Sequence, residues 1–206
     1  MHENESLLIC EKKTDSINSR VINWRRILMK KRTFVLLSLL VLSGCGIFGS
    51  STYAPLDVVS SVDLTRYAGV WYEIASLPVS QQEGCSCTTA EYVPIDSETV
   101  RVINACRKGP GNEIDRVEGK AFVVPGTNNA KLRVQFFWPF RGDYWILDLD
   151  RQYTYAVVGL PSRKYCWILS RTPEMKTELL EKLTADLRSK GFNVDRMQKT
   201  VHDCSK

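Results

Sequence analysis

The sequence has few of the residues and motifs from which most catalytic and metal sites are built. Histidine occurs at two positions, His2 and His202, and no glycine-rich phosphate loop, zinc-ligand spacing or internal repeat is present. His202 precedes Asp203 with no serine or cysteine placed to complete a catalytic triad. The Cys-Ser-Cys run at 85–87 lacks the second pair of ligands that a zinc site needs. The sequence therefore predicts no enzyme, no metal site and no cofactor.

The part of the chain after residue 44 has almost no excess of positive charge. The whole chain has 28 Lys and Arg against 23 Asp and Glu, a net charge of +5. Residues 1–44 hold eight of the basic and four of the acidic residues, which leaves 20 and 19 in residues 45–206, a net charge of +1. Nucleic-acid-binding domains concentrate Lys and Arg on one face. No nucleic-acid partner is therefore indicated.

No apolar run approaches the ~20 residues that a membrane-spanning helix needs. The run Phe34–Leu42 follows Lys-Lys-Arg at 30–32 and precedes the small residues Ser43-Gly44. A basic flank, a short apolar core and small residues before a cleavage point are typical of a secretory signal peptide. We interpret residues 29–44 as that signal and residues 1–28 as an upstream extension outside the native protein. The alternative is a buried hydrophobic helix.

The end of this signal, Leu42-Ser43-Gly44-Cys45, resembles the box of bacterial lipoproteins, whose cysteine is acylated and begins the mature protein. Cys45 is therefore the predicted lipidation site. Each buried methylene of an acyl chain such as palmitate contributes ~0.8 kcal/mol, so two or more chains give durable membrane anchoring. Gly46 stands where Asp would be the usual inner-membrane retention signal, which predicts the periplasmic face of the bacterial outer membrane. Residues 45–61 are then the lipidated cysteine and a polar tether.

The remainder of the chain is dominated by short runs rich in Val, Ile, Tyr, Phe and Trp, separated by turn clusters. Eight short sequential strands with hairpin-length links predict an all-β fold, an up-and-down antiparallel β-barrel whose closure removes both sheet edges. The predicted strands are 69–77, 86–95, 99–106, 114–124, 130–137, 143–149, 153–160 and 164–171.

One C-terminal α-helix is predicted after the last strand. Thr172 is a suitable N-cap, Pro173 suits the first helical position, and Gly191 is placed to end the helix. An apolar stripe should pack on the outside of the barrel. The stripe comprises Met175, Leu179, Leu180, Leu183 and Leu187. An extended piece over 195–203 is expected to lie against the sheet.

Two segments far apart in the sequence are predicted to close one end of the barrel. Gly69 allows the backbone to approach closely at a strand start, and two residues later Trp71 faces one side of that strand. In the last strand, alternation places Arg171 on the same face as Trp167. A guanidinium over an indole is the strongest cation–π pairing. We therefore predict that Arg171 covers Trp71; the alternative is a core tryptophan and an unrelated surface arginine.

These motifs resemble the lipocalin family, in particular its bacterial outer-membrane branch and its animal member apolipoprotein D. The resemblance covers about residues 62–204, within a predicted domain of 62–206. It rests on GVWYEIA at 69–75, LDRQY at 149–153 and WILSRTP at 167–173, with FFWPF at 136–140 typical of the bacterial branch. The family implies an eight-stranded calyx that holds one apolar ligand, and eight strands do enclose room for about one small molecule.

The resemblance also implies two disulfides, which a periplasmic location permits. Apolipoprotein D implies Cys87 with Cys204, and bacterial lipocalins imply Cys85 with Cys106. The second pair needs a bulge, because a regular hairpin around Ser97 sets Thr88 opposite Cys106. Cys166 is expected to remain a small buried hydrophobe under the helix.

Ligand contacts follow from strand alternation if Trp71 and Arg171 form the floor. The expected inward side chains are Glu73, Ala75, Ala90, Tyr92, Val102, Asn104, Tyr165 and Trp167. Trp138, Phe140 and Tyr144 are placed at the mouth, where they could meet lipid or a membrane surface. Glu73 is alternatively a salt-bridged or rim residue. Arg141, Arg163 and Lys164 could meet a carboxylate or phosphate headgroup, or form a solvated rim.

The leading hypothesis is a membrane-anchored lipocalin that binds a fatty acid, lysophospholipid or similar lipid for storage or transport at the outer membrane. Two alternatives stay open: a structural or interaction lipoprotein of the envelope with no exchangeable ligand, and an enzyme on the same fold. The sequence leaves both a monomer and a homodimer possible as the assembly.

Overall fold

The computed structural model describes residues 53–109, 111 and 113–204, which belong to a compact unit of residues 51–206. The predicted signal peptide, the upstream extension and Cys45 lie outside these described residues. Within the described part of the chain, no helix is long and apolar enough to cross a membrane.

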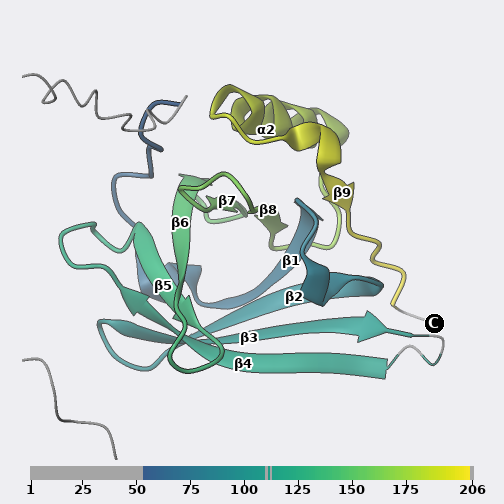
Figure 1. Cartoon of the computed structure of the whole chain (residues 1–206), viewed down its shortest axis with the longest axis horizontal. Helices are drawn as coiled ribbons and strands as arrows, with labels where there is room; N and C mark the ends of the chain where they lie inside the picture. Colours follow the sequence, from purple (N-terminus) through teal and green to yellow (C-terminus); the bar gives the residue numbers. More distant parts are fainter. Residues whose placement is uncertain (1–52, 110, 112, 205–206) are drawn as a thin grey trace, which may run out of the picture. The chain divides into compact units, whose positions relative to one another are not determined.

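Eight antiparallel strands form a closed barrel in which each strand pairs with the next and β1 pairs with both β2 and β8. Figure 1 shows the strands in this cyclic order. The fold predicted from the sequence is thereby confirmed. The strands are β1 (Gly69–Ser76), β2 (Cys85–Pro94), β3 (Thr99–Lys108), β4 (Glu113–Val123), β5 (Lys131–Gln135), β6 (Gly142–Leu149), β7 (Tyr155–Gly159) and β8 (Cys166–Ser170).

Five short or peripheral elements accompany the barrel. They are α1 (Leu64–Tyr67), the 3-10 turns η1 (Ser80–Gln82) and η2 (Val194–Arg196), α2 (Thr177–Ser189) and β9 (Gln198–Lys199). α1 is capped by Asp63, whose carboxylate accepts from the N–H groups of Thr65 and Arg66. β9 pairs with the end of β1.

Two apolar cores stabilise this arrangement. The interior core lies inside the barrel and includes Trp71, Val102 and Ile146. The outer core lies between the outer wall of the barrel and α2, where Leu180, Leu183 and Leu187 are buried. The apolar stripe predicted for the helix therefore packs on the barrel as expected.

The start of α2 differs from the prediction. The helix begins at Thr177, and its N-cap Lys176 makes no side-chain cap bond. Thr172 instead donates its hydroxyl to the carbonyl oxygen of Glu174 and lies 3.2 Å from the hydroxyl of Ser170. These local bonds satisfy Thr172 outside a helix, which is the usual competition between hydroxyl side chains and helical backbone.

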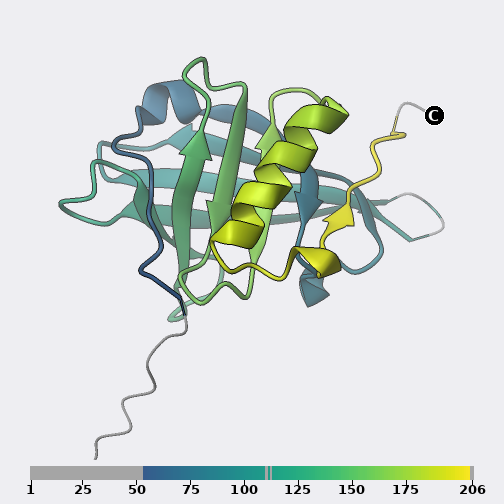
Figure 2. The same cartoon turned by 90° about the horizontal axis from the view of Figure 1, so that it is seen from above.

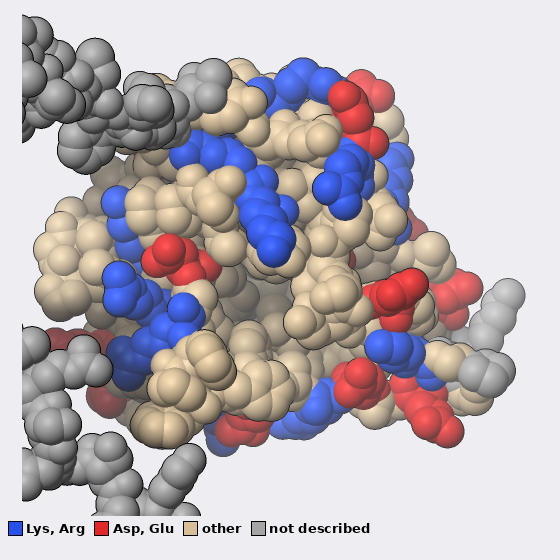
Figure 3. All heavy atoms as spheres, in the orientation of Figure 1, with Lys and Arg blue, Asp and Glu red and all other residues tan. Residues whose placement is uncertain are grey.

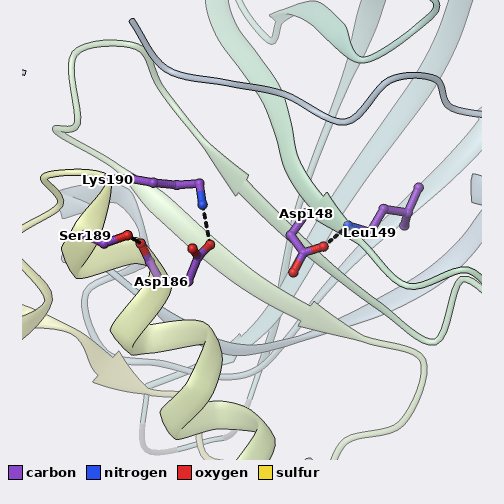
Figure 4. A network of polar contacts seen from close by, with 5 residues as sticks. All are labelled: Asp148, Leu149, Asp186, Ser189 and Lys190. Atoms are coloured by element: carbon purple, nitrogen blue, oxygen red, sulfur yellow. Dashed lines mark hydrogen bonds and ion pairs between the residues drawn. The ribbon is translucent and has the colours of Figure 1, made fainter. Parts of the chain in front are cut away.

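The end of α2 lies close to the predicted position. Gly191 follows the C-cap Lys190 and has a φ of 87°, a left-handed conformation that favours glycine. Figure 4 shows the side chain of Lys190 paired with Asp186, whose backbone oxygen also accepts from the hydroxyl of Ser189. The cation near the last carbonyls complements the negative end of the helix dipole.

Bulges interrupt β1, β2 and β6 and reverse which residues face inward. In β1 the pairing with β8 shifts between Glu73 and Ala75, so Ile74 and Ala75 both lie in the outer core beside α2. The expectation that Ala75 faces the ligand is therefore wrong. Alternation fails there because one extra residue in a strand turns every later side chain to the other face.

In β6 the shift lies between Ile146 and Asp148. Ile146 faces the interior core and Leu147 the outer core, and the Asp148 carboxylate accepts from the N–H of Leu149 (Figure 4). The side chain thus satisfies a backbone donor next to the bulge.

Candidate functional site: the barrel interior and its mouth

The floor of the barrel is built around Trp71, which is fully buried. The guanidinium of Arg171 lies 3.8 Å from the centre of its ring. Arg171 also donates to the carbonyl oxygens of Val70 (2.8 Å), Arg66 (2.8 Å) and Ala68 (2.9 Å). Two longer bonds, to the carbonyl oxygens of Tyr67 (3.2 Å) and Tyr153 (3.3 Å), complete the set. One side chain therefore closes the barrel end by a cation–π contact and five backbone hydrogen bonds at once.

Gly69 lies directly beneath this contact. Its φ of 91° is a left-handed conformation that favours glycine, whereas a Cβ there would lie 3.5 Å from the guanidinium of Arg171, an ordinary contact distance. The indole N–H of Trp71 donates to the carbonyl oxygen of Tyr67 at 2.8 Å, so no polar atom of the ring is left unpaired in the core. The three residues predicted to close the barrel are thus brought together.

Above the floor, three tyrosine hydroxyls meet. Tyr144 lies 2.8 Å from the hydroxyl of Tyr67 and 2.7 Å from that of Tyr92. Burial raises the pKa of all three phenols, that of Tyr92 to about 12. Tyr144 was expected at the mouth. It lies instead beside the floor, because it pairs with Leu132, the second residue of β5, whose side chain is buried in the interior core.

Some side chains on the inner face of the barrel, farther from the floor, are partly exposed to solvent. Asn104 pairs with Ala90 on one side and with Val117 on the other, so the three side chains share the inner face. Val117 is 36% exposed, and Ala90 and Asn104 are half-buried. Solvent can reach inward-facing residues only through a hollow, and Figure 3 shows one at the centre of this face of the molecule.

Trp167 faces the same space, and Tyr165 lies beside it. Trp167 pairs with the inward-facing Val158 and packs against the interior core, and its ring centre lies 6.2 Å from that of Tyr165. Val102 and Tyr92 are fully buried near the floor, so they form the base of the hollow. Strand alternation thus found the inner face correctly except where β1 bulges.

Loops that follow β1, β3, β5 and β7 lie at the end opposite the floor, because consecutive hairpin links alternate between the two ends of an up-and-down barrel. We call this end the mouth. The loop 136–141 places three aromatics there in solvent: Phe137 is 71% exposed, Trp138 87% and Phe140 77%. Phe137 was not among the expected site residues.

The carboxylate of Glu73 makes its hydrogen bonds to other side chains of the protein. This carboxylate is buried and accepts from the hydroxyls of Ser76 (2.9 Å) and Thr200 (2.8 Å) and from the amide of Gln82 (2.8 Å). These bonds join β1, the loop at η1 and the C-terminal segment beside a polar cavity of about 400 Å³. The arrangement favours a structural role over ligand contact.

The C-terminal segment fills a gap in the barrel wall. β1 pairs with β2 only as far as Tyr72, and beyond that point β9 lies along β1. The N–H of Cys87 donates to the carbonyl oxygen of Val201, and the ring of His202 donates to that of Glu73. Residues 198–203 therefore complete the wall near the mouth.

Two disulfides stabilise this region, Cys87–Cys204 and Cys85–Cys106. The bulge that the second bridge needs lies between Ser86 and Thr89, with Cys87 in a left-handed conformation (φ 55°). Cys166 is the free cysteine among the described residues; it is buried in the outer core, which raises the pKa of its thiol to about 12.

Arg163 has a role that the sequence did not reveal. It lies in the mouth loop 160–165, yet its guanidinium donates to the carbonyl oxygens of Pro161, Ala54 and Lys190. These contacts fix the first described residues of the chain. A conventional headgroup role for Arg163 is therefore less favoured, since its donors are already engaged.

A closed eight-stranded antiparallel barrel, plugged at one end and hollow at the other, defines a calyx of the kind that holds a small molecule. Residues 62–202 match the family described as the Lipocalin-like domain. The chain therefore belongs to the lipocalin family, as predicted.

Several known proteins are similar to this chain. Over 165 residues it is 36% identical to the outer membrane lipoprotein Blc of Vibrio cholerae, covering 80% of this chain and 94% of that protein. It is 38% identical to Blc of Escherichia coli K12 over 68% of this chain and 80% of that one, and 34% identical to apolipoprotein D of Bos taurus over 68% and 77%. Among solved structures, insecticyanin of Manduca sexta superposes with a TM-score of 0.60 at 23% identity over 74% of this chain and 87% of that one, which shows the shared fold.

Proposed function

We propose that this protein is a membrane-anchored lipocalin that binds a single-chain lipid, such as a fatty acid or lysophospholipid, in its barrel. The observation that carries the proposal is the hollow above the Trp71–Arg171 floor, lined by inward-facing side chains that remain partly exposed. An apolar surface kept open to water is stabilised when an apolar ligand covers it.

The energetics favour an acyl chain as that ligand. Burial of each methylene contributes ~0.8 kcal/mol, so a chain of about a dozen methylenes gives ~10 kcal/mol before the costs of ordering. Ala90, Val117 and Trp167 supply the apolar wall, and the exposed Arg141 and Lys164 in the mouth loops offer positive charge to a carboxylate or phosphate.

Two observations support the proposed location. The sequence has a lipoprotein box ending at Cys45, and similar proteins from Vibrio cholerae and Escherichia coli are named outer membrane lipoproteins. We infer acylation of Cys45, an anchor on the periplasmic face of the outer membrane, and a role in lipid storage or transport there.

Native mass spectrometry of the full-length protein with Cys45→Ala, which removes the acylation site, tests the proposal. A co-purified lipid that exchanges for an added fatty acid is the expected result. A protein that stays empty and does not bind a fluorescent fatty acid would favour a structural lipoprotein whose barrel is filled by its own side chains.

A further inference from the structure

The point where the chain enters the folded domain lies at the mouth. Arg163, in the mouth loop between β7 and β8, holds the carbonyl oxygen of Ala54 and lies 5.7 Å from the ring centre of Tyr53. From there the chain runs along the barrel, where Leu56 is buried beside α2 and the N–H of Val59 donates to the carbonyl oxygen of Ile146 at 3.0 Å. Figure 2 shows this blue segment beginning at the same end of the barrel as η1.

The segment ends at the opposite end of the barrel. The N–H of Val62 donates to the carbonyl oxygen of Asn128 in the loop between β4 and β5, which lies at the floor end. Residues 54–61, which we expected to be part of the tether, are thus packed along the wall. The tether that remains between Cys45 and Tyr53 spans eight peptide units.

A tether of that length limits how the domain can stand on a membrane. Fully extended, eight residues reach about 29 Å. β4 has 11 residues, and at a usual strand tilt of ~40° a strand of that length makes a barrel about 27 Å tall. With the mouth turned away from the membrane, the tether would have to run almost fully extended along the whole barrel. With the mouth toward the membrane, it can stay relaxed.

The same end carries the side chains suited to a bilayer surface. Phe137, Trp138 and Phe140 are each more than two-thirds exposed in one six-residue loop. Aromatic rings are favoured at the level of lipid headgroups. The exposed Arg141 ends this loop, and the exposed Lys164 lies in the neighbouring mouth loop. Figure 3 shows Lys and Arg side chains at several points around the hollow.

We propose that the loop 136–141 docks onto the surface of a phospholipid bilayer with anionic headgroups, so that the mouth of the barrel opens directly onto the membrane. This orientation rests on the proposed function for the anchor at Cys45. The membrane-binding surface itself is inferred from the exposed aromatic residues and does not require the anchor. A lipid could then pass between bilayer and barrel without crossing water.

The first test uses the acylated full-length protein in vesicles of phosphatidylethanolamine and phosphatidylglycerol with brominated acyl chains, which quench tryptophan fluorescence on contact. Quenching is expected in the parent protein and should be much weaker in Trp138→Phe, where the quenching that remains comes from Trp167 in the hollow. Trp145→Phe is the matched control, because Trp145 lies on the barrel wall under Lys131, and it should keep the quenching. Absence of quenching in the parent, or its loss in Trp145→Phe alone, would overturn the orientation.

The second test separates the surface from the anchor. With Cys45→Ala, flotation with the same vesicles should fall at least about tenfold when Phe137, Trp138 and Phe140 are all replaced by Ser, since their apolar area no longer leaves water. Arg141→Gln should lower it about fivefold on anionic vesicles only. Ile95→Ser, an exposed apolar residue at the floor end, is the control and should change nothing.

Two outcomes distinguish this proposal from others. If the parent protein binds no fatty acid but still floats, the proposed function fails and the membrane surface stands. If the triple variant instead abolishes a dimer in sedimentation and leaves flotation unchanged, the loop is a contact between two copies of the chain and the proposal is overturned.

Discussion

The hydroxyl of Thr200 donates to the buried carboxylate of Glu73 at 2.8 Å, across 127 residues of sequence. The bond lies where β2 has diverged from β1 and the C-terminal segment takes its place in the wall. Closure of the barrel near its mouth therefore depends on a segment that follows the last barrel strand and the helix. Substitutions at Glu73 and Thr200 measure how much this contact between β1 and the C-terminal segment contributes to stability.

Replacing Glu73 by Ala should destabilise the fold by about 3 kcal/mol, because the Ser76, Gln82 and Thr200 donors would lose their shared acceptor. Thr200→Val, which removes one donor, should cost about 1 kcal/mol. Urea unfolding of the Cys45→Ala protein measures both. Glu178→Gln on the exposed face of α2 is the control; an equal loss in that variant would argue against a specific role for Glu73.

Arg171→Lys should lower the free energy of unfolding by about 2 kcal/mol although the charge is kept. An ammonium cannot reproduce the planar fork that serves five carbonyl oxygens and covers Trp71 at the same time. Arg151→Lys, at an exposed position in the loop after β6, should be neutral. A fully stable Arg171→Lys protein would show that the floor does not need the guanidinium.

The tyrosine cluster predicts instability in strong alkali. Burial raises the pKa of Tyr67, Tyr92 and Tyr144 in the folded state, so the fold keeps their full contribution below the unfolded value of 10. Stability should fall as the pH rises from about 10 through about 12, the value for Tyr92. Urea unfolding at a series of pH values measures this slope.

Tyr144→Phe should make the alkaline slope shallower and, at neutral pH, cost about 1–3 kcal/mol, because Tyr67 and Tyr92 lose their common partner. An unchanged slope in this variant would place the titrating groups elsewhere.

The two disulfides should contribute unequally. Cys87–Cys204 closes a loop of 117 residues and Cys85–Cys106 one of 21. In the chain-entropy model the longer loop is worth ~5 kcal/mol and the shorter ~3 kcal/mol. Unfolding of Cys204→Ala compared with that of Cys106→Ala, each with its partner cysteine also replaced, tests this order, and a reversed order would contradict it.

Much of the fold could be predicted because local sequence patterns determine where each strand begins and ends. Alternation and turn residues located all eight strands within a few positions, and the Trp71–Arg171 floor followed from strand parity at both ends of the domain. The placement of Asn104 and Trp167 on the inner face followed in the same way.

The errors arose where a residue's surroundings, rather than its neighbours in sequence, decide its position. Ala75 turned outward because a bulge adds one residue to β1, and no turn residue marks that bulge. Thr172 looked like a helix cap but bonds within its own loop. The clamp of Arg163 on Ala54 joins residues 109 positions apart, and no periodicity could reveal it.

The most direct measurement is the dissociation constant of a fluorescent fatty acid for the Cys45→Ala protein and for Val117→Trp, which places an indole in the hollow. Ile114→Trp puts the same ring on the outward face of the same strand, three residues away, at a position that is 70% exposed. Binding should be weakened at least about tenfold by Val117→Trp, since the inserted ring displaces several methylenes, and should be unchanged by Ile114→Trp. Equal binding by all three proteins would contradict a ligand site inside the barrel.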